Sequence, residues 1–137
     1  LRRMNPAIAG EDAGYIVLEF ANGTTGLIDG NRLNDHSATN TRLTMGEHWL
    51  EGSAGVMHLN GDGALRFKPH GEPAADHAYE WHNRGFGGDC VFALQARVVR
   101  DIRSKVDSAN TGEAYLRNIR IAEAVYQSNA SGSTVRV

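Results

Sequence analysis

Apolar and polar positions alternate differently in the two parts of this chain, and the difference predicts strands first and helices second. Residues 15–20 alternate with a period of two, as expected for a strand with one buried face. Asn22-Gly23 follows directly, a pair that tolerates two successive positive φ angles and so favours a tight hairpin turn. We therefore predict an antiparallel hairpin whose second strand covers approximately residues 24–32.

Glycine-containing turns divide the middle of the chain into further short strands. A polar loop at residues 33–40 precedes this region, and a surface loop with two of the three prolines lies within it at residues 69–76. The predicted strands cover residues 41–51, 56–60, 64–68 and 79–82, with turns at residues 52–55 and 61–63.

Apolar residues then recur at spacings of three and four, which is typical of helices. The first predicted helix follows Asp89, whose carboxylate is expected to cap it, and carries an apolar stripe at residues 91, 94, 98 and 102. The second runs from its cap at Thr111 to about Ser128 and is apolar on most sides, so we expect it to be largely buried. Gly132 fits the end of this helix, and residues 134–137 suit a last strand.

Strands followed by helices predict an α+β fold, a mainly antiparallel open sheet with helices packed on one face. A chain of 137 residues has the size of one domain, so we expect a single α+β domain over residues 1–137. The first eighty or so residues supply the sheet and the remainder supplies the helices. Nothing in this pattern requires a second core.

Charge and composition exclude several kinds of partner. Fourteen basic residues face sixteen acidic ones, and no basic cluster stands out, so we expect neither nucleic acid nor an anionic membrane as a partner. The longest apolar runs, at residues 15–18 and 90–94, are far shorter than a membrane span. A single cysteine permits no internal disulfide, which fits a reducing cytoplasm. We therefore expect a cytoplasmic protein.

Motifs for cofactors and catalysis are missing. Gly61-x-Gly63 and Gly85-x-Gly87 do not continue into a dinucleotide fingerprint, because Arg66 and Cys90 stand where the third glycine would fall. The six histidines are dispersed, without a spacing typical of metal ligands. Cys90 is interpreted as a buried structural cysteine rather than a nucleophile. We expect no cofactor-binding, metal-binding or catalytic residue in this chain.

Candidate substrate contacts come from the polar loop and from tryptophan. The side chains around this loop could donate hydrogen bonds to hydroxyls or to a carboxylate, although such loops usually face water. Trp49 and Trp81 could each stack on a sugar ring, or be ordinary sheet residues. The candidates are Arg32, His36, Asn40, Arg42 and Trp49, with Asn34 as a further loop donor.

The order of elements resembles a known domain. Four segments carry the resemblance: the hairpin at residues 11–26, the Gly-x-x-Gly turn within residues 49–56, the helix entry at residues 86–102, and the helix at residues 111–128 with the glycine and valine after it. Together they resemble the C-terminal domain of the Gfo/Idh/MocA oxidoreductases, the glucose-fructose oxidoreductase and inositol dehydrogenase family. The resemblance implies a fold like the C-terminal domain of dihydrodipicolinate reductase.

The resemblance also implies a division of labour. In that family an N-terminal Rossmann domain holds NAD or NADP, and such an α+β domain closes the substrate pocket and forms oligomer contacts through its open sheet. Its proton-transfer residues lie in a Glu-Lys-Pro motif and an Asp-x-x-x-His motif. Neither motif occurs in this sequence. For the second motif, no histidine has an acidic residue four positions before it. Substrate contacts are expected near Asn40 and Arg42, and the catalytic residues outside this chain.

We therefore expect the substrate-binding and oligomerisation domain of an NAD(P)-dependent oxidoreductase acting on a sugar, polyol or related hydroxyl compound, catalytically silent by itself. Its expected partners are a Rossmann domain, a small-molecule substrate, and a second copy that forms a homodimer through the open sheet face. The alternative is a stand-alone ligand-binding or scaffold module that reuses this fold. A small enzyme that uses its own histidines and aspartates is a third possibility, for which the sequence gives no sign.

Overall fold

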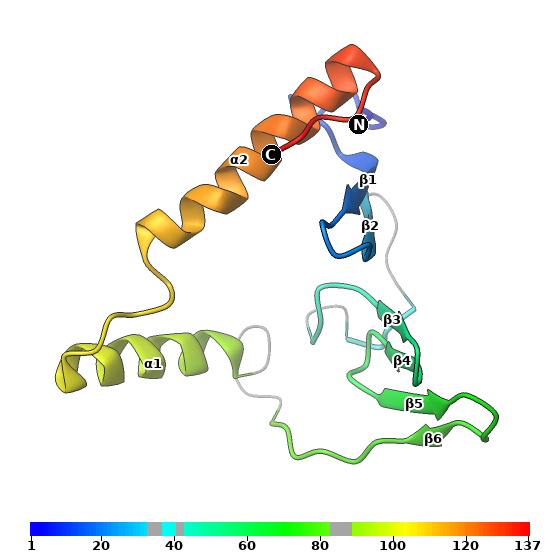
Figure 1. The fold of residues 1–137 in the computed structure, drawn as a ribbon, viewed down its shortest axis with the longest axis vertical. Helices are drawn as coiled ribbons and strands as arrows, with labels where there is room; N and C mark the ends of the chain where they lie inside the picture. The colour runs from blue at the N-terminus through cyan, green and yellow to red at the C-terminus, as the bar shows by residue number, and fades with distance from the viewer. Residues whose placement is uncertain (33–36, 41–42, 83–88) are drawn as a thin grey trace. The chain divides into compact units, whose positions relative to one another are not determined.

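The computed structural model describes residues 1–32, 37–40, 43–82 and 89–137, which form six strands followed by two helices (Figure 1). Two compact units make up the chain: Leu1–Asn34 with Ser108–Val137, and Asp35–Asp107. Each unit contains one antiparallel sheet and one helix. The predicted α+β class with an open, mainly antiparallel sheet is confirmed.

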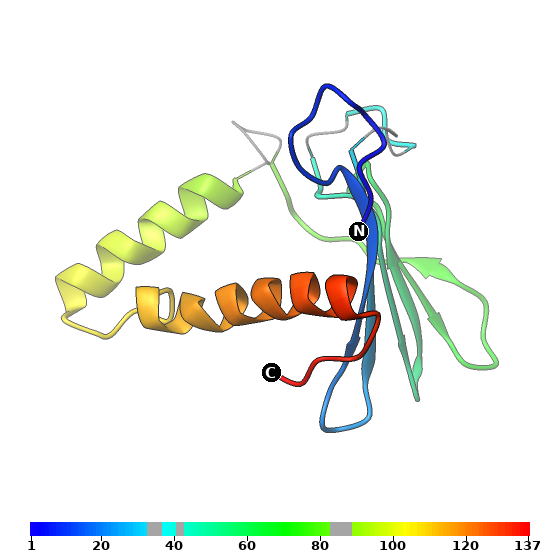
Figure 2. The ribbon, with the colours of Figure 1, turned by 90° about the horizontal axis from the view of Figure 1, so that it is seen from above.

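The sheet of the first unit is a hairpin of β1 (Ala13–Glu19) and β2 (Thr25–Asn31). Residues 20–24 connect the strands at the end far from the N-terminus, as Figure 2 shows. Gly23 has a positive φ of 84°, but Asn22 does not, because its side-chain oxygen instead accepts a hydrogen bond of 3.1 Å from the Thr24 N–H. The hairpin prediction is confirmed, whereas the tight turn with two successive positive φ angles was wrong.

Helix α2 (Gly112–Ser131) begins after its predicted cap and extends beyond the predicted end near Ser128, up to the predicted exit at Gly132. The Thr111 hydroxyl accepts a hydrogen bond of 3.1 Å from the Ala114 N–H, which satisfies one free donor of the first turn. Gly132 adopts the left-handed conformation at φ 65° and donates its N–H to the Ser128 carbonyl. Residues 134–137, predicted as a strand, belong to none.

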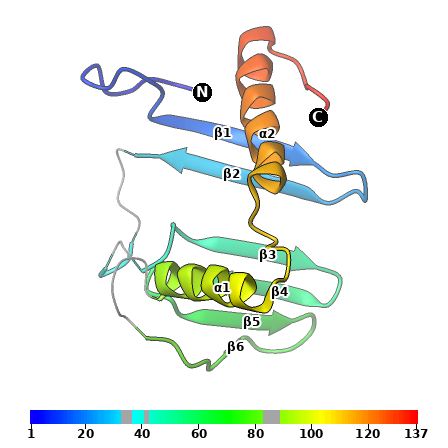
Figure 3. The ribbon, with the colours of Figure 1, turned by 90° about the vertical axis from the view of Figure 1, so that its left-hand side faces the viewer.

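The two faces of the hairpin have different surroundings. In Figure 3, α2 lies across the face of β1 and β2, and Ile16 and Ile28 line a cavity there with Val125 of the helix. On the opposite face, Val17 pairs with Leu27, and their exposed fractions are 62% and 67%. No residue of α2 is buried, so the expectation of a largely buried helix was wrong.

A buried carboxylate joins the N-terminal segment to this hairpin. Asp12 is only 3% exposed, and its carboxylate oxygens accept hydrogen bonds of 2.6 Å from the Met4 N–H and 2.7 Å from the Asn5 N–H. The hydrogen bond from Met4, and after it that from Asn5, stabilises the charged carboxylate and so lowers the pKa of Asp12 below its usual value. The Asp12 carbonyl also accepts a hydrogen bond from the Arg32 N–H, just beyond β2.

The second unit contains a meander of four strands, each antiparallel to its sequence neighbour. Figure 3 shows how these strands lie side by side. Their bounds are β3 (His48–Gly52), β4 (Gly55–Leu59), β5 (Leu65–Pro69) and β6 (Ala75–Asp76).

These bounds correct two predictions. The strand predicted over residues 41–51 begins only at His48, and the last short strand is β6, whereas residues 79–82 belong to no strand. The turn before β4 lies where expected, and Gly55 is required there. Its φ is 154°, and a Cβ at this position would lie 2.3 Å from the Lys68 carbonyl oxygen.

The pairing register separates an apolar face of this sheet from a polar one. Leu50, Met57 and Phe67 lie opposite one another on β3, β4 and β5, so they share one face. Trp49, His58 and Arg66 share the other face by the same register. One face therefore needs an apolar cover, and the other tolerates water.

Helix α1 (Cys90–Ser104) completes the second unit. Asp89 precedes it, but its side chain makes no capping hydrogen bond, so the predicted cap was wrong. The predicted apolar stripe is present yet open to solvent, with Val98 37% and Ile102 72% exposed. Indeed, no apolar side chain is buried anywhere in the part of the chain that the structure describes, nor is a helix there long and apolar enough to cross a membrane.

Replacing the cap of α2 gives a first test. Thr111→Ala removes the acceptor for the Ala114 N–H and should lower the free energy of unfolding by about 1 kcal/mol, measured by urea denaturation followed by circular dichroism. Thr111→Ser keeps the hydroxyl and should remain within a few tenths of a kcal/mol of the parent. Equal losses in both variants would contradict the capping role.

Asp12 gives a pH-dependent test. Because its pKa is lowered in the folded state, its charged form stabilises the N-terminal segment above the ordinary value of 3.8, and this contribution is lost as the pH falls through the folded pKa. NMR should show the Met4 and Asn5 amide shifts moving together with a midpoint below 3.8. Asp12→Asn should abolish that transition, and a midpoint above 3.8 would refute the assignment.

Candidate functional site

Each unit contains a sizeable cavity, and the linings differ in chemistry. The cavity of the first unit, 490 Å³, lies where the inner face of the hairpin meets α2 and is lined largely by aliphatic side chains such as Ile16 and Val125. It has the character of an incompletely filled core. The cavity of the second unit, 430 Å³, is lined by aromatic and ionisable side chains. Apolar walls with a few convergent polar groups are typical of ligand sites, so the second cavity is the candidate.

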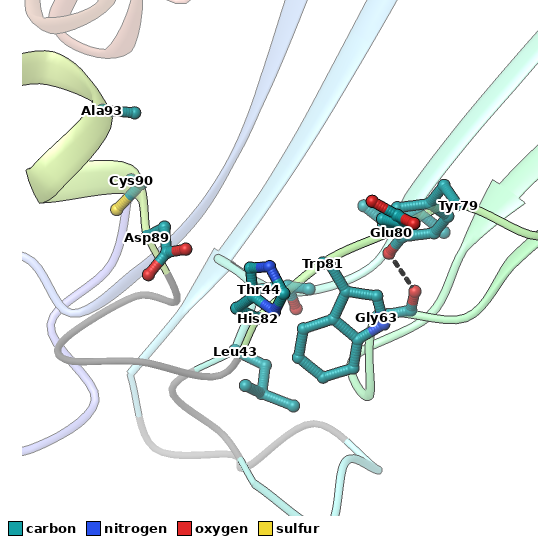
Figure 4. A pocket seen from close by; sticks show the side chains of 11 residues that line it. Leu43, Thr44, Gly63, Tyr79, Glu80, Trp81, His82, Asp89, Cys90 and Ala93 are labelled. Carbon is teal, nitrogen blue, oxygen red and sulfur yellow. Dashed lines mark hydrogen bonds between the residues drawn. The ribbon is translucent and has the colours of Figure 1, made fainter.

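We name this candidate the Trp81 cavity. It lies among the segment before β3, the turn between β4 and β5, the segment after β6, and the first turn of α1 (Figure 4). Its lining residues are Leu43, Thr44, Leu59, Gly63, Tyr79, Glu80, Trp81, His82, Asp89, Cys90 and Ala93.

One turn forms the base of the cavity. The side-chain oxygen of Asn60 accepts hydrogen bonds of 3.1 Å from the Asp62 N–H and 2.9 Å from the Ala64 N–H. Gly63 supplies the positive φ of 83° that closes the turn. Gly61 and Gly63 are both buried. The turn between β4 and β5 is therefore defined by its own side chain and backbone, independently of any cover over the sheet.

The same turn holds two other segments in place. The Asp62 carboxylate accepts a hydrogen bond of 2.8 Å from the Thr39 N–H, and the Thr44 hydroxyl lies 3.3 Å from the Gly61 carbonyl oxygen. On its other side, the Tyr79 hydroxyl donates a hydrogen bond to the Gly63 carbonyl, drawn as a dashed line in Figure 4. The turn thus contacts segments that form the walls of the cavity.

Two aromatic rings form one wall. Tyr79 is 41% and Trp81 46% exposed. A Cβ placed on Gly63 would lie 3.5 Å from the Tyr79 hydroxyl oxygen and 3.9 Å from Cζ2 of Trp81, so one edge of each side chain lies beside the turn. The sequence-based candidates include Trp49 and not Trp81, because a lone tryptophan carries no spacing signal that could select Trp81. Only the contact with the turn distinguishes Trp81.

Ionisable side chains complete the lining. Glu80 and His82 flank Trp81 along the chain, and Asp89 and Cys90 come from the start of α1. Cys90 is exposed, so its interpretation as a buried structural cysteine was wrong. Within the described residues, no group of three potential ligands could hold a metal ion. The arrangement offers an apolar aromatic surface with hydrogen-bonding groups beside it, which suits a small polar ring.

The structure places the sequence-predicted candidates separately. Arg32 is exposed and lines the cavity of the first unit. Asn40 belongs to the second unit, and its carbonyl accepts a hydrogen bond of 3.2 Å from the N–H of Leu43. Leu43 lines the Trp81 cavity. His36 and Arg42 lie outside the described residues. The substrate contacts expected of these side chains therefore stay predictions.

Trp49, the fifth candidate, is engaged elsewhere. Its indole ring stacks on the His58 imidazole, with the ring centroids 4.1 Å apart and the planes inclined by 18°. Nε2 of His58 lies 3.6 Å from one carboxylate oxygen of Glu47, and the other oxygen accepts a hydrogen bond from the Ser37 hydroxyl. Trp49 does not line the Trp81 cavity, and its expected stacking on a sugar ring also stays a prediction.

Comparison with known proteins gives one informative similarity. The chain is 26% identical over 148 residues to D-apiose dehydrogenase of Rhizobium rhizogenes (strain K84 / ATCC BAA-868). The alignment covers 99% of this chain but only 41% of that protein, so the chain spans less than half the length of this relative. No family model matches the chain, and no solved structure does. Similarity to part of a sugar dehydrogenase is the functional information the comparisons provide.

Asn60 gives a test of how the site is built. Asn60→Ala leaves the Asp62 and Ala64 N–H groups without their acceptor and should lower the free energy of unfolding by about 1–2 kcal/mol. It should also speed hydrogen exchange at these two amides. Asn60→Asp keeps an acceptor oxygen and should preserve both readouts. Asn22→Ala removes a similar bond from the other turn, so it should leave exchange at Asp62 and Ala64 unchanged; an equal effect there would contradict a local role for Asn60.

Proposed function

We propose that this chain is the substrate-binding domain of an NAD(P)-dependent oxidoreductase acting on a sugar, polyol or related hydroxyl compound. The observation that carries the proposal is the alignment of 99% of the chain with D-apiose dehydrogenase. The activity in the name of that relative supplies both the reaction class and the sugar. The four segments that resemble the C-terminal domain of the Gfo/Idh/MocA oxidoreductases support the same assignment and suggest membership of that family.

The described residues do not fit a nicotinamide cofactor. Both sheets are antiparallel, and neither helix follows a parallel strand through a glycine-rich turn, which is the arrangement that receives a pyrophosphate. NAD or NADP therefore belongs to another part of the full enzyme in this proposal. Hydride transfer needs the nicotinamide, an acid/base group and the substrate carbon held together, so the chain alone is expected to be silent.

The contribution of this chain is to bind and orient the substrate. In the proposal, the apolar part of the lining of the Trp81 cavity covers an apolar face of the substrate and displaces water from it. His82 and Glu80 offer hydrogen-bonding groups for its hydroxyls, since an imidazole can donate and accept while a carboxylate accepts. These residues position the substrate and carry no proton-transfer step of their own.

The assembly is part of the same proposal. Residues 1–137 act as one domain in a cytoplasmic enzyme, and a second copy covers the outer face of the β1–β2 hairpin. That face presents Tyr15, Val17 and Leu27, each more than 60% exposed. Burying such apolar side chains contributes about 1.5–3 kcal/mol each, and a self-complementary patch of this kind suits a two-fold dimer.

The alternative is a stand-alone ligand-binding module. One observation favours it: residues of the second unit alone line the Trp81 cavity, so a ligand could bind without a dehydrogenase partner. Both functions predict binding of a hydroxyl compound. They differ in whether the binding serves a nicotinamide reaction elsewhere in the protein.

The proposal is tested on the purified 137-residue chain. Size-exclusion chromatography with light scattering should give a dimer, calorimetry with NAD(H) and NADP(H) should show no binding, and saturation-transfer NMR should detect D-apiose on the protein. Val17→Glu should shift the dimer toward monomer without changing the D-apiose signal. Micromolar nucleotide binding, or the absence of any signal from D-apiose and from a panel of other sugars and polyols at millimolar concentrations, would overturn the assignment.

The two candidate functions are separated with the complete protein. A nicotinamide-dependent oxidation of D-apiose or a related polyol by that protein supports the oxidoreductase. Binding of the sugar with no turnover of either nucleotide over a panel of sugars and polyols supports the stand-alone module.

A further inference from the structure

We propose that Trp81 is the platform on which the ring of the substrate packs, and that the turn between β4 and β5 is the element that positions this platform. The inference rests on the proposed function and deepens it, because it names the side chain that recognises a hydroxyl-bearing ring. Neither the sequence motifs nor the comparison with D-apiose dehydrogenase assigns Trp81 a role.

Trp81 is supported on one side and open on another. Cζ2 of its indole would lie 3.9 Å from a Cβ placed on Gly63, so this edge of the ring lies beside the buried turn. The side chain is nevertheless 46% exposed and lines the 430 Å³ cavity (Figure 4). A ring beside a defined turn that keeps part of its surface open to a cavity can cover a ligand at a small entropic cost of ordering.

The chemistry around the ring suits a cyclic hydroxyl compound. Such a ring presents C–H groups on its faces and hydroxyls at its rim, so it needs an apolar surface with hydrogen-bonding groups beside it. Trp81 supplies the apolar surface, and His82 and Glu80 follow and precede it along the same lining segment. Leu43 and Leu59 extend the apolar wall. A short acyclic polyol could form hydrogen bonds with His82 and Glu80, but it would not cover the indole of Trp81.

The second tryptophan lacks this arrangement. His58 stacks on Trp49 at a centroid distance of 4.1 Å, so the protein itself already covers one side of that indole. The ring also lies on the polar face of the four-stranded sheet, outside the lining of the cavity. Trp49 is therefore the matched control for Trp81 within the same chain.

Tyr79 connects the platform to the turn. Its hydroxyl donates to the Gly63 carbonyl, and its ring stands two residues before Trp81 in the same wall. Gly63 has a φ of 83°, a backbone conformation that residues with a Cβ rarely adopt. Tyr79 and Gly63 are thus positioning residues, which act on the ligand through the placement of Trp81.

The experiment uses Trp81 as its own reporter. In a Trp49→Phe chain, the emission of Trp81 should change saturably as D-apiose or myo-inositol is added, and glycerol, which has no ring, should leave it unchanged. Trp81→Ala should weaken D-apiose binding about fivefold to tenfold in saturation-transfer NMR, the effect expected for a lost aromatic contact. Because this proposal places the ring on Trp81 and not on the other candidate, Trp49, the Trp49→Phe chain should bind as tightly as the parent. A loss of affinity as large as that of Trp81→Ala would favour the Trp49 prediction and overturn the proposal.

Two further variants keep the test meaningful if Trp81→Ala disturbs the fold. Trp81→Phe retains a smaller platform and should lose less affinity than Trp81→Ala. Tyr79→Phe removes only the bond to Gly63 and should reduce the emission change at Trp81 while keeping the amide spectrum of the sheet. Unchanged affinity in both Trp81 variants, or sugar binding that leaves Trp81 emission constant, would refute the platform while the proposed function stands. Failure of the parent chain to bind these rings or any other sugar or polyol of the panel would overturn both.

Discussion

Uncovered apolar surface is the physical constraint on which this structure depends. The outer face of the hairpin, the face of the second sheet that carries Leu50, and the stripe of α1 each present apolar side chains, and the described residues bury none of them. Removing such surface from water is the dominant favourable term in folding. Each of these faces would therefore gain stability from an apolar surface that covers it.

Local polar contacts hold the elements in shape independently of that partner. Asp12 fixes the N-terminal segment, Thr111 begins α2, and Asn60 closes the turn beneath the Trp81 cavity. Each satisfies backbone N–H groups no more than eight residues away along the chain, so these bonds form between neighbouring parts of the sequence. The candidate site consequently lies on the part of the molecule whose geometry is defined by its own sequence.

The difference between local polar contacts and the covering of apolar faces explains what the sequence could predict. The strands, most turns, and the cap at Thr111 follow from local periodicity and turn chemistry. The turn at Asn22 differed because its side chain competed for a backbone N–H, and two-residue β6 is too short to leave a pattern. The burial of α2 depends on what covers it. Trp81 becomes a candidate only once residues 60–64 and 79–82, distant in sequence, are seen to meet.

The meander topology has a consequence for how the chain folds. Each strand pairs with its immediate neighbour in sequence, so every ladder closes through a short loop. Such local contacts cost little loop-closure entropy, and hairpins form within about 1–10 μs. The covering of the apolar faces comes afterwards and is slower. If a second copy supplies that cover, the slow phase of refolding is second order and accelerates with protein concentration, whereas the early formation of the hairpins does not.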